Sequence, residues 1–240
     1  MSDANERNVI SGNGLSGVTV TGTTTTGTII AGNYIGLNAS GAAAVGNSQR
    51  GVNVFGGAKN TRIGTNGDGT NDSSERNIIS GNTMEGVLVQ NTTTSGTVIA
   101  GNYIGTSAAG TTRIGNSSGV SVNAGATNTR IGTDGSNDAF NDNERNVISG
   151  NNAMGVFIGD TNTTGVSIAG NYIGITPDGL TALRNNDSGV YLFNTVATRV
   201  GTNADGVRDD AERNIISGNT IHGIFVTGSS ANNKIGRAHV

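Results

Sequence analysis

The chain of 240 residues has no cysteine, no tryptophan and a single proline. The lack of cysteine excludes disulfide and thiol chemistry, and it removes the usual clue to the redox state of the compartment. Charged residues make up only 13% of the sequence and the net charge is -3, which gives no electrostatic case for nucleic acid or an anionic membrane as a partner. No apolar run approaches the roughly 20 residues that a membrane helix needs, so membrane insertion is not expected.

Glycine, by contrast, is abundant, with 40 residues. It shows no G-X-Y period and almost no accompanying proline, which excludes collagen and a typical disordered linker. The first eight residues lack the basic and apolar pattern of a signal peptide. We therefore expect a fragment of a longer repeat protein, or a protein that lacks its leader, with a single domain over residues 1–240.

An asparagine recurs along the whole chain in steps of 34 or 35 residues. It stands at Asn13, Asn47, Asn82, Asn116, Asn151, Asn185 and Asn219. A glycine follows each asparagine by three or four residues and opens a short segment of alternating character. A fixed period of this length indicates a solenoid, here of about seven coils. The asparagines are expected to form a hydrogen-bonded ladder at a tight turn, with the glycines as part of the scaffold.

Each coil is predicted to contain three short strands. The first is centred on Ile30, Ile63, Ile99, Ile131, Ile168, Val200 and Ile235. The second reads Asn-Val-Ile-Ser-Gly-Asn, as at Asn8–Asn13, or the shorter Arg-Ile-Gly-Asn at Arg113–Asn116. The third follows the glycine, and one of its faces is aliphatic in every coil, as at Val120 and Val122. Stacked coils about 4.8 Å apart bury that face continuously.

The repeated motifs carry a resemblance. Asn-Val-Ile-Ser-Gly-Asn, Gly-Val-x-Val, Ile-Ala-Gly-Asn-Tyr-Ile-Gly and Asn-Thr-Arg-Ile-Gly resemble the right-handed parallel β-helix repeats of large bacterial surface and secreted proteins, which are similar in fold to pectin lyases. The resemblance extends from Asn5 to Gly236 and implies an all-β solenoid in a secreted or cell-surface setting. Residues 237–240 depart from the repeat, and no cap is visible at either end. Neighbouring segments of a longer protein, or end-to-end self-association, are therefore a further expectation.

Three long acidic loops offer hard oxygen ligands beside glycine, which suits Ca²⁺. The candidate ligands are Asp68, Asp72, Asp134, Asp138, Asp205 and Asp209. No loop matches the EF-hand or nonapeptide pattern. The alternative is a solvated loop whose carboxylates pair with Arg76, Arg145 or Arg213. Calcium is thus an optional stabiliser, and no cofactor is required.

Arginines on the first strand are expected to stand outward and pair with these acidic loops. They are Arg62, Arg130 and Arg199, at one position of the repeat. Arg50 and Glu85 hold equivalent turn positions in adjacent coils, so we expect a salt bridge between them.

The outward face of the third strand carries an aromatic row, which is the best candidate for a binding surface. The residues are Phe157, Tyr191 and Phe225 at one position of consecutive coils, with Phe193 and Phe55 at the next outward position. Such a row suits stacking against a sugar, or contact with a partner protein. The alternative is a ladder that only stabilises the strands or lies under a loop such as residues 161–165. Asp187 and His222, near Tyr191, are the one candidate for a catalytic pair, and the favoured alternative is that they form a plain surface contact.

The sequence favours a non-catalytic extracellular segment that serves adhesion, binding or structure, with a glycan or protein on the aromatic face. The alternative is a polysaccharide-active lyase, hydrolase or epimerase, because many β-helices are enzymes of these kinds. No aspartate pair has glycosidase spacing, and no singular motif breaks the repeat. An ice-binding face is a third idea, since Thr19, Thr21 and Thr227 face outward, but phenylalanine and leucine interrupt that array.

Overall fold

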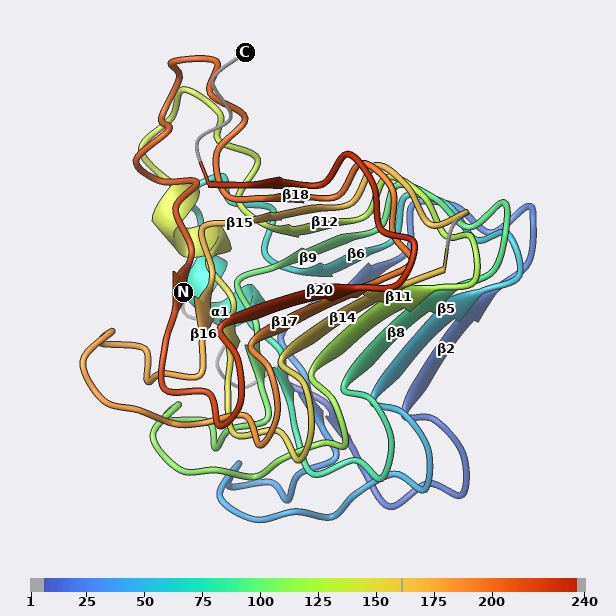
Figure 1. Cartoon of the computed structure of the whole chain (residues 1–240). Helices are drawn as coiled ribbons and strands as arrows, with labels where there is room; N and C mark the ends of the chain where they lie inside the picture. The colour runs from blue at the N-terminus through green and yellow to red at the C-terminus, as the bar shows by residue number, and fades with distance from the viewer. Residues whose placement is uncertain (1–6, 161, 237–240) are drawn as a thin grey trace.

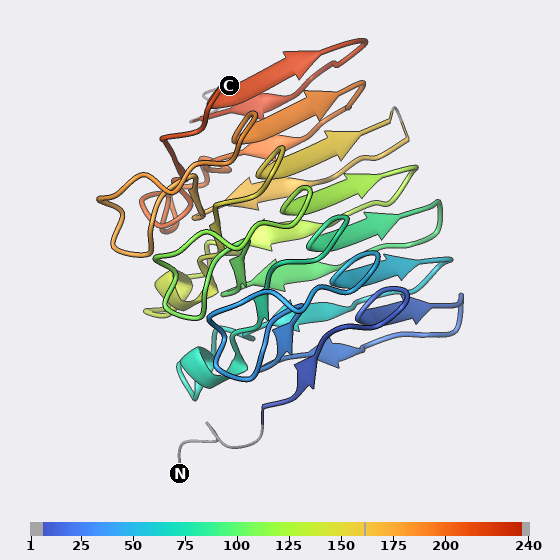
Figure 2. The same cartoon turned by 90° about the horizontal axis from the view of Figure 1, so that it is seen from below.

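The computed structural model describes residues 7–160 and 162–236. Within them the chain forms a right-handed parallel β-helix of about six turns, close to the expected seven. Three parallel sheets of seven strands each surround an aliphatic core. Figure 1 views the stack from the side of its C-terminal coil, and Figure 2 shows the coils lying one above another. The expected departure from the repeat at residues 237–240 lies outside the described residues.

Each coil contributes one strand to each sheet, which confirms the prediction of three short strands. Sheet A contains β1 (Val9–Ile10), β4 (Tyr34–Ile35), β7 (Ile78–Ile79), β10 (Tyr103–Ile104), β13 (Val147–Ile148), β16 (Tyr172–Ile173) and β19 (Ile215–Ile216). Sheet B contains β2 (Val18–Thr21), β5 (Val52–Phe55), β8 (Val87–Gln90), β11 (Val120–Asn123), β14 (Val156–Gly159), β17 (Val190–Phe193) and β20 (Ile224–Thr227). Sheet C contains β3 (Ile29–Ile30), β6 (Arg62–Gly64), β9 (Val98–Ala100), β12 (Arg130–Gly132), β15 (Ser167–Ala169), β18 (Arg199–Val200) and β21 (Lys234–Ile235).

The strand expected at Arg113–Asn116 is wrong. In that coil type the strand of sheet A is formed by Tyr-Ile of the Asn-Tyr-Ile-Gly motif, as in β10, which pairs with β7 and β13. Arg113 instead closes a hairpin through an antiparallel bridge to Thr106. A two-residue strand leaves no alternation to read, so Arg-Ile-Gly looked as plausible as Tyr-Ile-Gly.

Alternation directs the aliphatic face of sheet B inward, as predicted. Val87, Val120 and Val156 pair in register across β8, β11 and β14, and each is fully buried. Successive coils thus present the same side chain at the same height, and the apolar face of one strand is covered by those of its neighbours.

Two ladders of asparagines run beside the core, where one was predicted, and their inner rungs are buried. The predicted ladder starts at Asn13, and its Nδ2 to Oδ1 distances lie between 2.8 and 3.2 Å. The second ladder consists of Asn8, Asn33, Asn77, Asn102, Asn146, Asn171 and Asn214, with distances between 2.9 and 3.1 Å. The backbone N–H groups join in: that of Asn102 donates to Asn146 Oδ1 at 2.9 Å.

Except in the last described coil, the glycines before sheet B are required by space. A Cβ on Gly86 would lie 2.8 Å from the amide nitrogen of Asn116 and 2.8 Å from the carbonyl oxygen of Gly119. No side chain fits between the asparagine ladder and the next coil there. Gly105, at the end of the Asn-Tyr-Ile-Gly motif, has φ +94 and a carbonyl oxygen 2.3 Å from where its Cβ would stand, so both its conformation and its surroundings demand glycine.

Insertions alternate between two corners of the coil. Hairpins closed by Leu37–Ala44, Thr106–Arg113 and Ile175–Ala182 bridges follow sheet A in every second coil. The long acidic loops lie between sheets C and A, and two of them contain the one-turn helices α1 (Asp72–Glu75) and η1 (Asn141–Glu144). The loops of one kind contact each other two coils apart, since Asn143 donates to Asp72 at 2.7 Å.

We predict that Val122→Asp unfolds the chain. Val122 is fully buried at the centre of the stack, and a buried unpaired carboxylate costs several kcal/mol, comparable with the whole stability of a domain. Thermal melts followed by circular dichroism provide the measurement. The neighbouring Asn123→Asp, on the half-buried outward side, is the matched control and should melt near the parent. A Val122→Asp protein that melts within a few degrees of the parent would show that the inward assignment is wrong.

A second stability prediction concerns threonines at the start of sheet C. Among the described residues, the buried Oγ1 of Thr129 has no hydrogen-bond partner, and valine takes its place one coil further on at Val166. Thr129→Val should therefore stabilise the fold by about 1 kcal/mol, a rise of roughly 2–4 °C in melting temperature. Thr65→Val is the contrast, because the Thr65 hydroxyl hydrogen-bonds Asp72 and the Gly67 N–H. An equal loss of stability in both variants would contradict this interpretation.

Candidate functional site

The glutamate of the Glu-Arg-Asn motif anchors each long loop to sheet C. Glu144 accepts from Arg130 at 2.7 Å, and Glu212 accepts from Arg199 at 2.9 Å. Glu75 pairs with Arg62 in the same way, at 3.0 Å. The predicted pairing of these outward arginines with the acidic loops is thus confirmed.

Each glutamate also accepts a backbone N–H from the start of its loop, for example that of Asp134 on Glu144. The side chains of Glu144 and Glu212 are only 5% and 0% exposed. A buried carboxylate that is paired and hydrogen-bonded in this way holds its loop in place, and it is not available to a ligand.

The arginine of the same motif binds the following coil. The guanidinium of Arg76 lies 4.3 Å from the ring centre of Tyr103, and that of Arg145 lies 4.4 Å from Tyr172. Arg7 covers Tyr34 at 4.2 Å. These cation–π contacts explain why Glu-Arg-Asn and Asn-Tyr-Ile-Gly alternate along the chain. The motifs that repeat most clearly in the sequence are therefore occupied inside the scaffold.

The aspartates predicted as calcium ligands are hydrogen-bonded within their own loops. Asp72 accepts from Thr65 and the Gly69 N–H, and Asp209 accepts from Thr202. The remaining four each accept a backbone N–H two residues further on: Asp68, Asp134, Asp138 and Asp205. The alternative pairing with the arginine of Glu-Arg-Asn occurs between Asp142 and Arg145.

Two of these carboxyls have a lowered pKa. The Thr70 N–H donates to Asp68 and lowers the pKa of that carboxyl, while the Ser136 hydroxyl does the same for Asp138. Over residues 7–160 and 162–236, no three acidic or histidine side chains gather into a group that could hold a metal ion. Calcium binding stays a prediction.

The calcium hypothesis predicts that millimolar Ca²⁺ raises the melting temperature relative to EDTA, because a ligand that binds only the folded state adds stability. The variant Asp68→Ala, Asp138→Ala, Asp205→Ala should lose that increment. Magnesium at the same concentration is the control for ionic strength. Identical melting curves in calcium and in EDTA would contradict the hypothesis that these loops bind calcium.

The aromatic row on the outside of sheet B forms as predicted. Phe157, Tyr191 and Phe225 pair in register across β14, β17 and β20. The ring of Tyr191 lies 5.6 Å from that of Phe157 in an edge-on arrangement and 5.0 Å from that of Phe225. Phe193 meets Tyr191 edge-on at 6.3 Å. We call these four residues the aromatic row.

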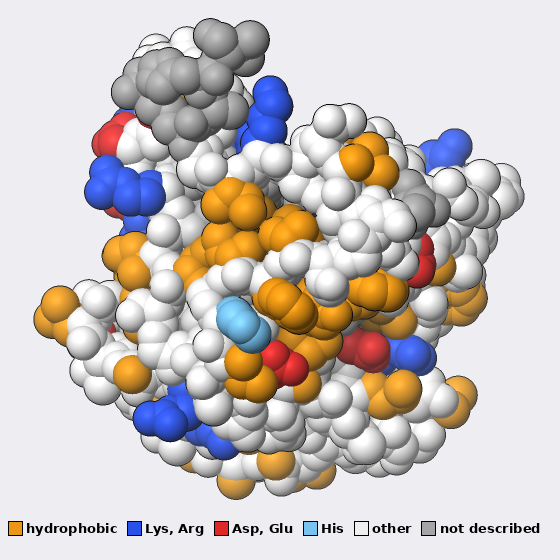
Figure 3. Space-filling view, viewed as in Figure 1, with side chains coloured by type: hydrophobic (Ala, Val, Ile, Leu, Met, Phe, Trp, Pro, Cys, Tyr) orange, Lys and Arg blue, Asp and Glu red, His pale blue; other side chains and the backbone are white. Residues whose placement is uncertain are grey.

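At the first outward position of sheet B, the side chains at the two ends of the stack are exposed and those in β5, β8 and β11 are buried. Phe193 and Phe225 are 37% and 36% exposed, whereas Asn53, Leu88 and Ser121, at the same outward position as Phe225 in earlier coils, are buried. Phe55 is half-buried and contacts none of the aromatic row. Figure 3 shows hydrophobic side chains gathered on this side, with an acidic side chain and a histidine at their border.

Asp187 and His222 lie together at the edge of the aromatic row, but a serine stands between them. The Ser188 hydroxyl donates to Asp187 at 3.0 Å and lies 3.5 Å from His222 Nδ1. The His222 ring stacks on Phe225 at 4.7 Å. Ser188 is fully buried, so it positions the two side chains and is not accessible as a nucleophile. Sequence spacing alone gave no sign of its role, because serine is common at such turns.

The salt bridge predicted between Arg50 and Glu85 is present at 3.0 Å, beside the N-terminal part of the same face. Phe157, Tyr191 and Phe225 alternate with the aliphatic core positions, and no arginine or lysine stands at an outward position of β14, β17 or β20. Asp160 comes directly after β14, and Asp187 lies shortly before β17. The face thus combines aromatic rings with hydroxyl, imidazole and carboxylate groups, and these three strands carry no arginine or lysine at outward positions.

No family model matches this chain, and no curated protein matches it. Its structure is similar to that of the A-module of the Azotobacter vinelandii mannuronan C-5 epimerase AlgE6, at 18% sequence identity and a TM-score of 0.47. The match covers 97% of this chain and 57% of the other, so this chain spans little more than half the length of that structure. No helix in the described ranges is long and apolar enough to cross a membrane. The chain is a parallel β-helix, and its Glu-Arg-Asn and Asn-Tyr-Ile-Gly motifs form contacts that hold the coils together.

Proposed function

We propose that this chain is a non-catalytic segment of a secreted or cell-surface protein, and that it binds a glycan on the aromatic row. One observation carries the proposal: the aromatic row is the part of the surface that does not follow the repeat. The Glu-Arg-Asn and Asn-Tyr-Ile-Gly motifs are engaged in coil-to-coil contacts. Phe157, Tyr191 and Phe225 stand outward where Thr19, Asn53 and Ser121 stand in other coils.

The chemistry of the face favours a neutral sugar chain. Half-exposed rings at 5.0 and 5.6 Å spacing offer apolar contact, and the polar groups at their border can hydrogen-bond hydroxyl groups. The carboxylates of Asp160 and Asp187 flank the aromatic row, and no arginine or lysine stands at an outward position of its strands to balance a uronate or sulfate. A neutral glycan therefore fits this face better than a polyanion.

The enzyme alternative has one observation in its favour, the contact of Asp187 and His222 through Ser188. An imidazole beside an aromatic sugar platform is placed as a general base would be. Its own hydrogen-bond network counts against it, because Asp187 does not contact the imidazole directly. An activity assay tests this alternative. If the unmodified chain released reducing ends or unsaturated sugars from a polysaccharide, and His222→Ala did not, the enzyme alternative would be established.

To test binding, we compare the parent with the triple variant Phe157→Ala, Tyr191→Ala, Phe225→Ala on an array of neutral and acidic glycans. We expect the parent to bind neutral chains and the variant to lose at least tenfold in affinity, since each ring contributes about 0.5–1.5 kcal/mol beyond its buried area. Circular dichroism verifies that the fold persists.

Phe140→Ala is the matched control, because Phe140 is 39% exposed but lies on a long loop away from sheet B. It should bind like the parent. A folded triple variant with unchanged glycan binding, or a parent that binds no neutral glycan, would reduce the aromatic row to a ladder that stabilises the strands.

A further inference from the structure

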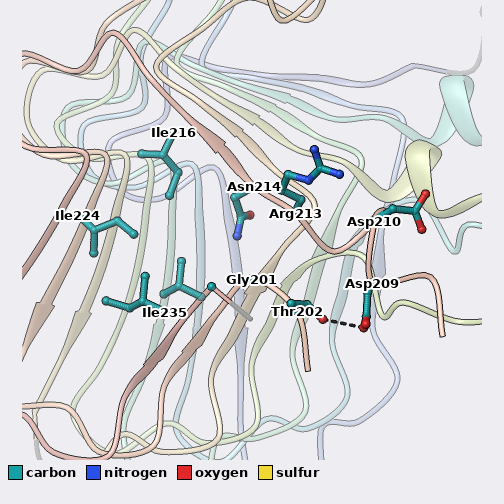
Figure 4. Close-up of a pocket in the computed structure, with 11 residues that line it drawn as sticks. Gly201, Thr202, Asp209, Asp210, Arg213, Asn214, Ile216, Ile224 and Ile235 are labelled. Carbon is teal, nitrogen blue, oxygen red and sulfur yellow. Dashed lines mark hydrogen bonds between the residues drawn. The ribbon is translucent and has the colours of Figure 1, made fainter. Parts of the chain in front are cut away.

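A hollow of about 540 Å³ lies at the last described coil, where Ile216, Ile224 and Ile235 surround it (Figure 4). These side chains stand at core positions, because they pair in register with buried residues of the preceding coil. The aromatic row stands on the opposite, outward face of sheet B. The hollow is therefore not part of the proposed glycan-binding face, whose shape is set by the outward residues of sheet B.

Gly159 is the one glycine at an outward position in the seven described strands of sheet B. It occupies the second outward position, which is held in chain order by Thr21, Phe55, Gln90, Asn123, Gly159, Phe193 and Thr227. Six of the seven strands thus carry a side chain at this position. The geometry of the sheet accepts a side chain there, so the glycine of β14 needs a separate explanation.

The backbone of β14 does not require glycine at this position. Gly105 has φ +94 and a backbone carbonyl oxygen 2.3 Å from where its Cβ would stand, whereas Gly159 lies outside the left-handed region. A Cβ on Gly159 would instead lie 2.6 Å from Cζ and 2.7 Å from Cε1 of Phe157. The obstacle is thus the end of a flexible side chain, and the Phe157 ring is the group that would have to move.

The missing side chain leaves the space that the Phe157 ring occupies. The ring reaches along β14, and its end lies over Gly159, two residues further on. In this position it meets the Tyr191 ring edge-on, with the ring centres 5.6 Å apart and an angle of 73° between the planes. In the next coil Phe193 pairs with Gly159 and carries a ring of its own, 6.3 Å from that of Tyr191. Gly159 therefore determines where the first ring of the aromatic row lies.

From these contacts we propose that Gly159 is a positioning residue of the aromatic row. Because it has no side chain, the Phe157 ring can lie over β14, in the orientation that meets Tyr191 and presents both rings to the same glycan. This inference rests on the proposed function of the aromatic row. It adds a residue that offers no side-chain group to the ligand and acts through Phe157. The alternative role is structural, in which the ring only covers the strand where the glycine leaves it bare.

Gly159→Ala tests the positioning role. The fold should persist, with a melting temperature within a few degrees of the parent, because the Phe157 ring can turn to another rotamer. The affinity for the neutral glycan that the parent binds should fall roughly two- to tenfold, as in Phe157→Ala, since the aromatic contact is lost. Asn123→Ala is the matched control at the same outward position one coil earlier, and it should bind like the parent.

The double variant Phe157→Ala, Gly159→Ala separates an effect through the ring from a direct effect on the ligand. If Gly159 acts through Phe157, adding Gly159→Ala to Phe157→Ala should cause no further loss of affinity. Losses that multiply would show that the new methyl group obstructs the glycan itself, and they would contradict the positioning role.

The position of the ring is measured without any glycan. Nuclear Overhauser effects between the ring protons of Phe157 and Tyr191 should be present in the parent and weakened or absent in Gly159→Ala, and their retention at parental strength would overturn the inference. A parent that binds a neutral glycan no better than Gly159→Ala does would also overturn it, and would leave the proposed function standing. A parent that binds no neutral glycan would overturn the proposed function and, with it, the role of Gly159 in binding.

Discussion

A carboxamide buried between coils must exchange hydrogen bonds with protein, because no water reaches it. Asn146 satisfies this requirement through its neighbours in the ladder, Asn102 and Asn171, and through the carbonyl oxygen of Ile99. The requirement is met only when every coil brings an asparagine to the same height. Strand register, the inward direction of the aliphatic face and the glycines beside the ladders all follow from that condition. The identity of the side chains on the outer surface is not constrained by this condition.

Much of the fold was predictable because the main repeat has a nearly constant length. The ladder that starts at Asn13 has steps of 34 or 35 residues, since each step includes two plain corners and one corner with an insertion. The second ladder was not predicted because its steps are unequal. Steps of 25 residues alternate with steps of 43 or 44 residues. Both insertions fall into the same step there, so a fixed-period reading sees no repeat. The misplaced strand at Arg113–Asn116 has the same origin, a hairpin inserted where an unbroken coil was assumed.

The candidate site was predictable to a different degree. Alternation placed Phe157, Tyr191 and Phe225 outward and one coil apart, and both features hold. The burial of Leu88 at the same outward position could not be predicted from alternation. Alternation gives the direction of a side chain, but its exposure depends on residues outside the strand that cover it. Ser188 was missed for a related reason. Its contact with His222 joins coils 34 residues apart, and the sequence contains many serines at comparable turns.

The alternation of insertions has a consequence for how such a protein can change over time. A long loop is anchored by its own glutamate to the strand before it, as Glu144 is to Arg130, and it touches another loop of its kind only two coils away. The corner between sheets B and C, which carries no insertion, keeps the coils in register. A loop or hairpin can therefore be lengthened, shortened or exchanged while the ladders remain intact. The surface of the β-helix is in this sense modular, with two rows of replaceable segments on one invariant frame.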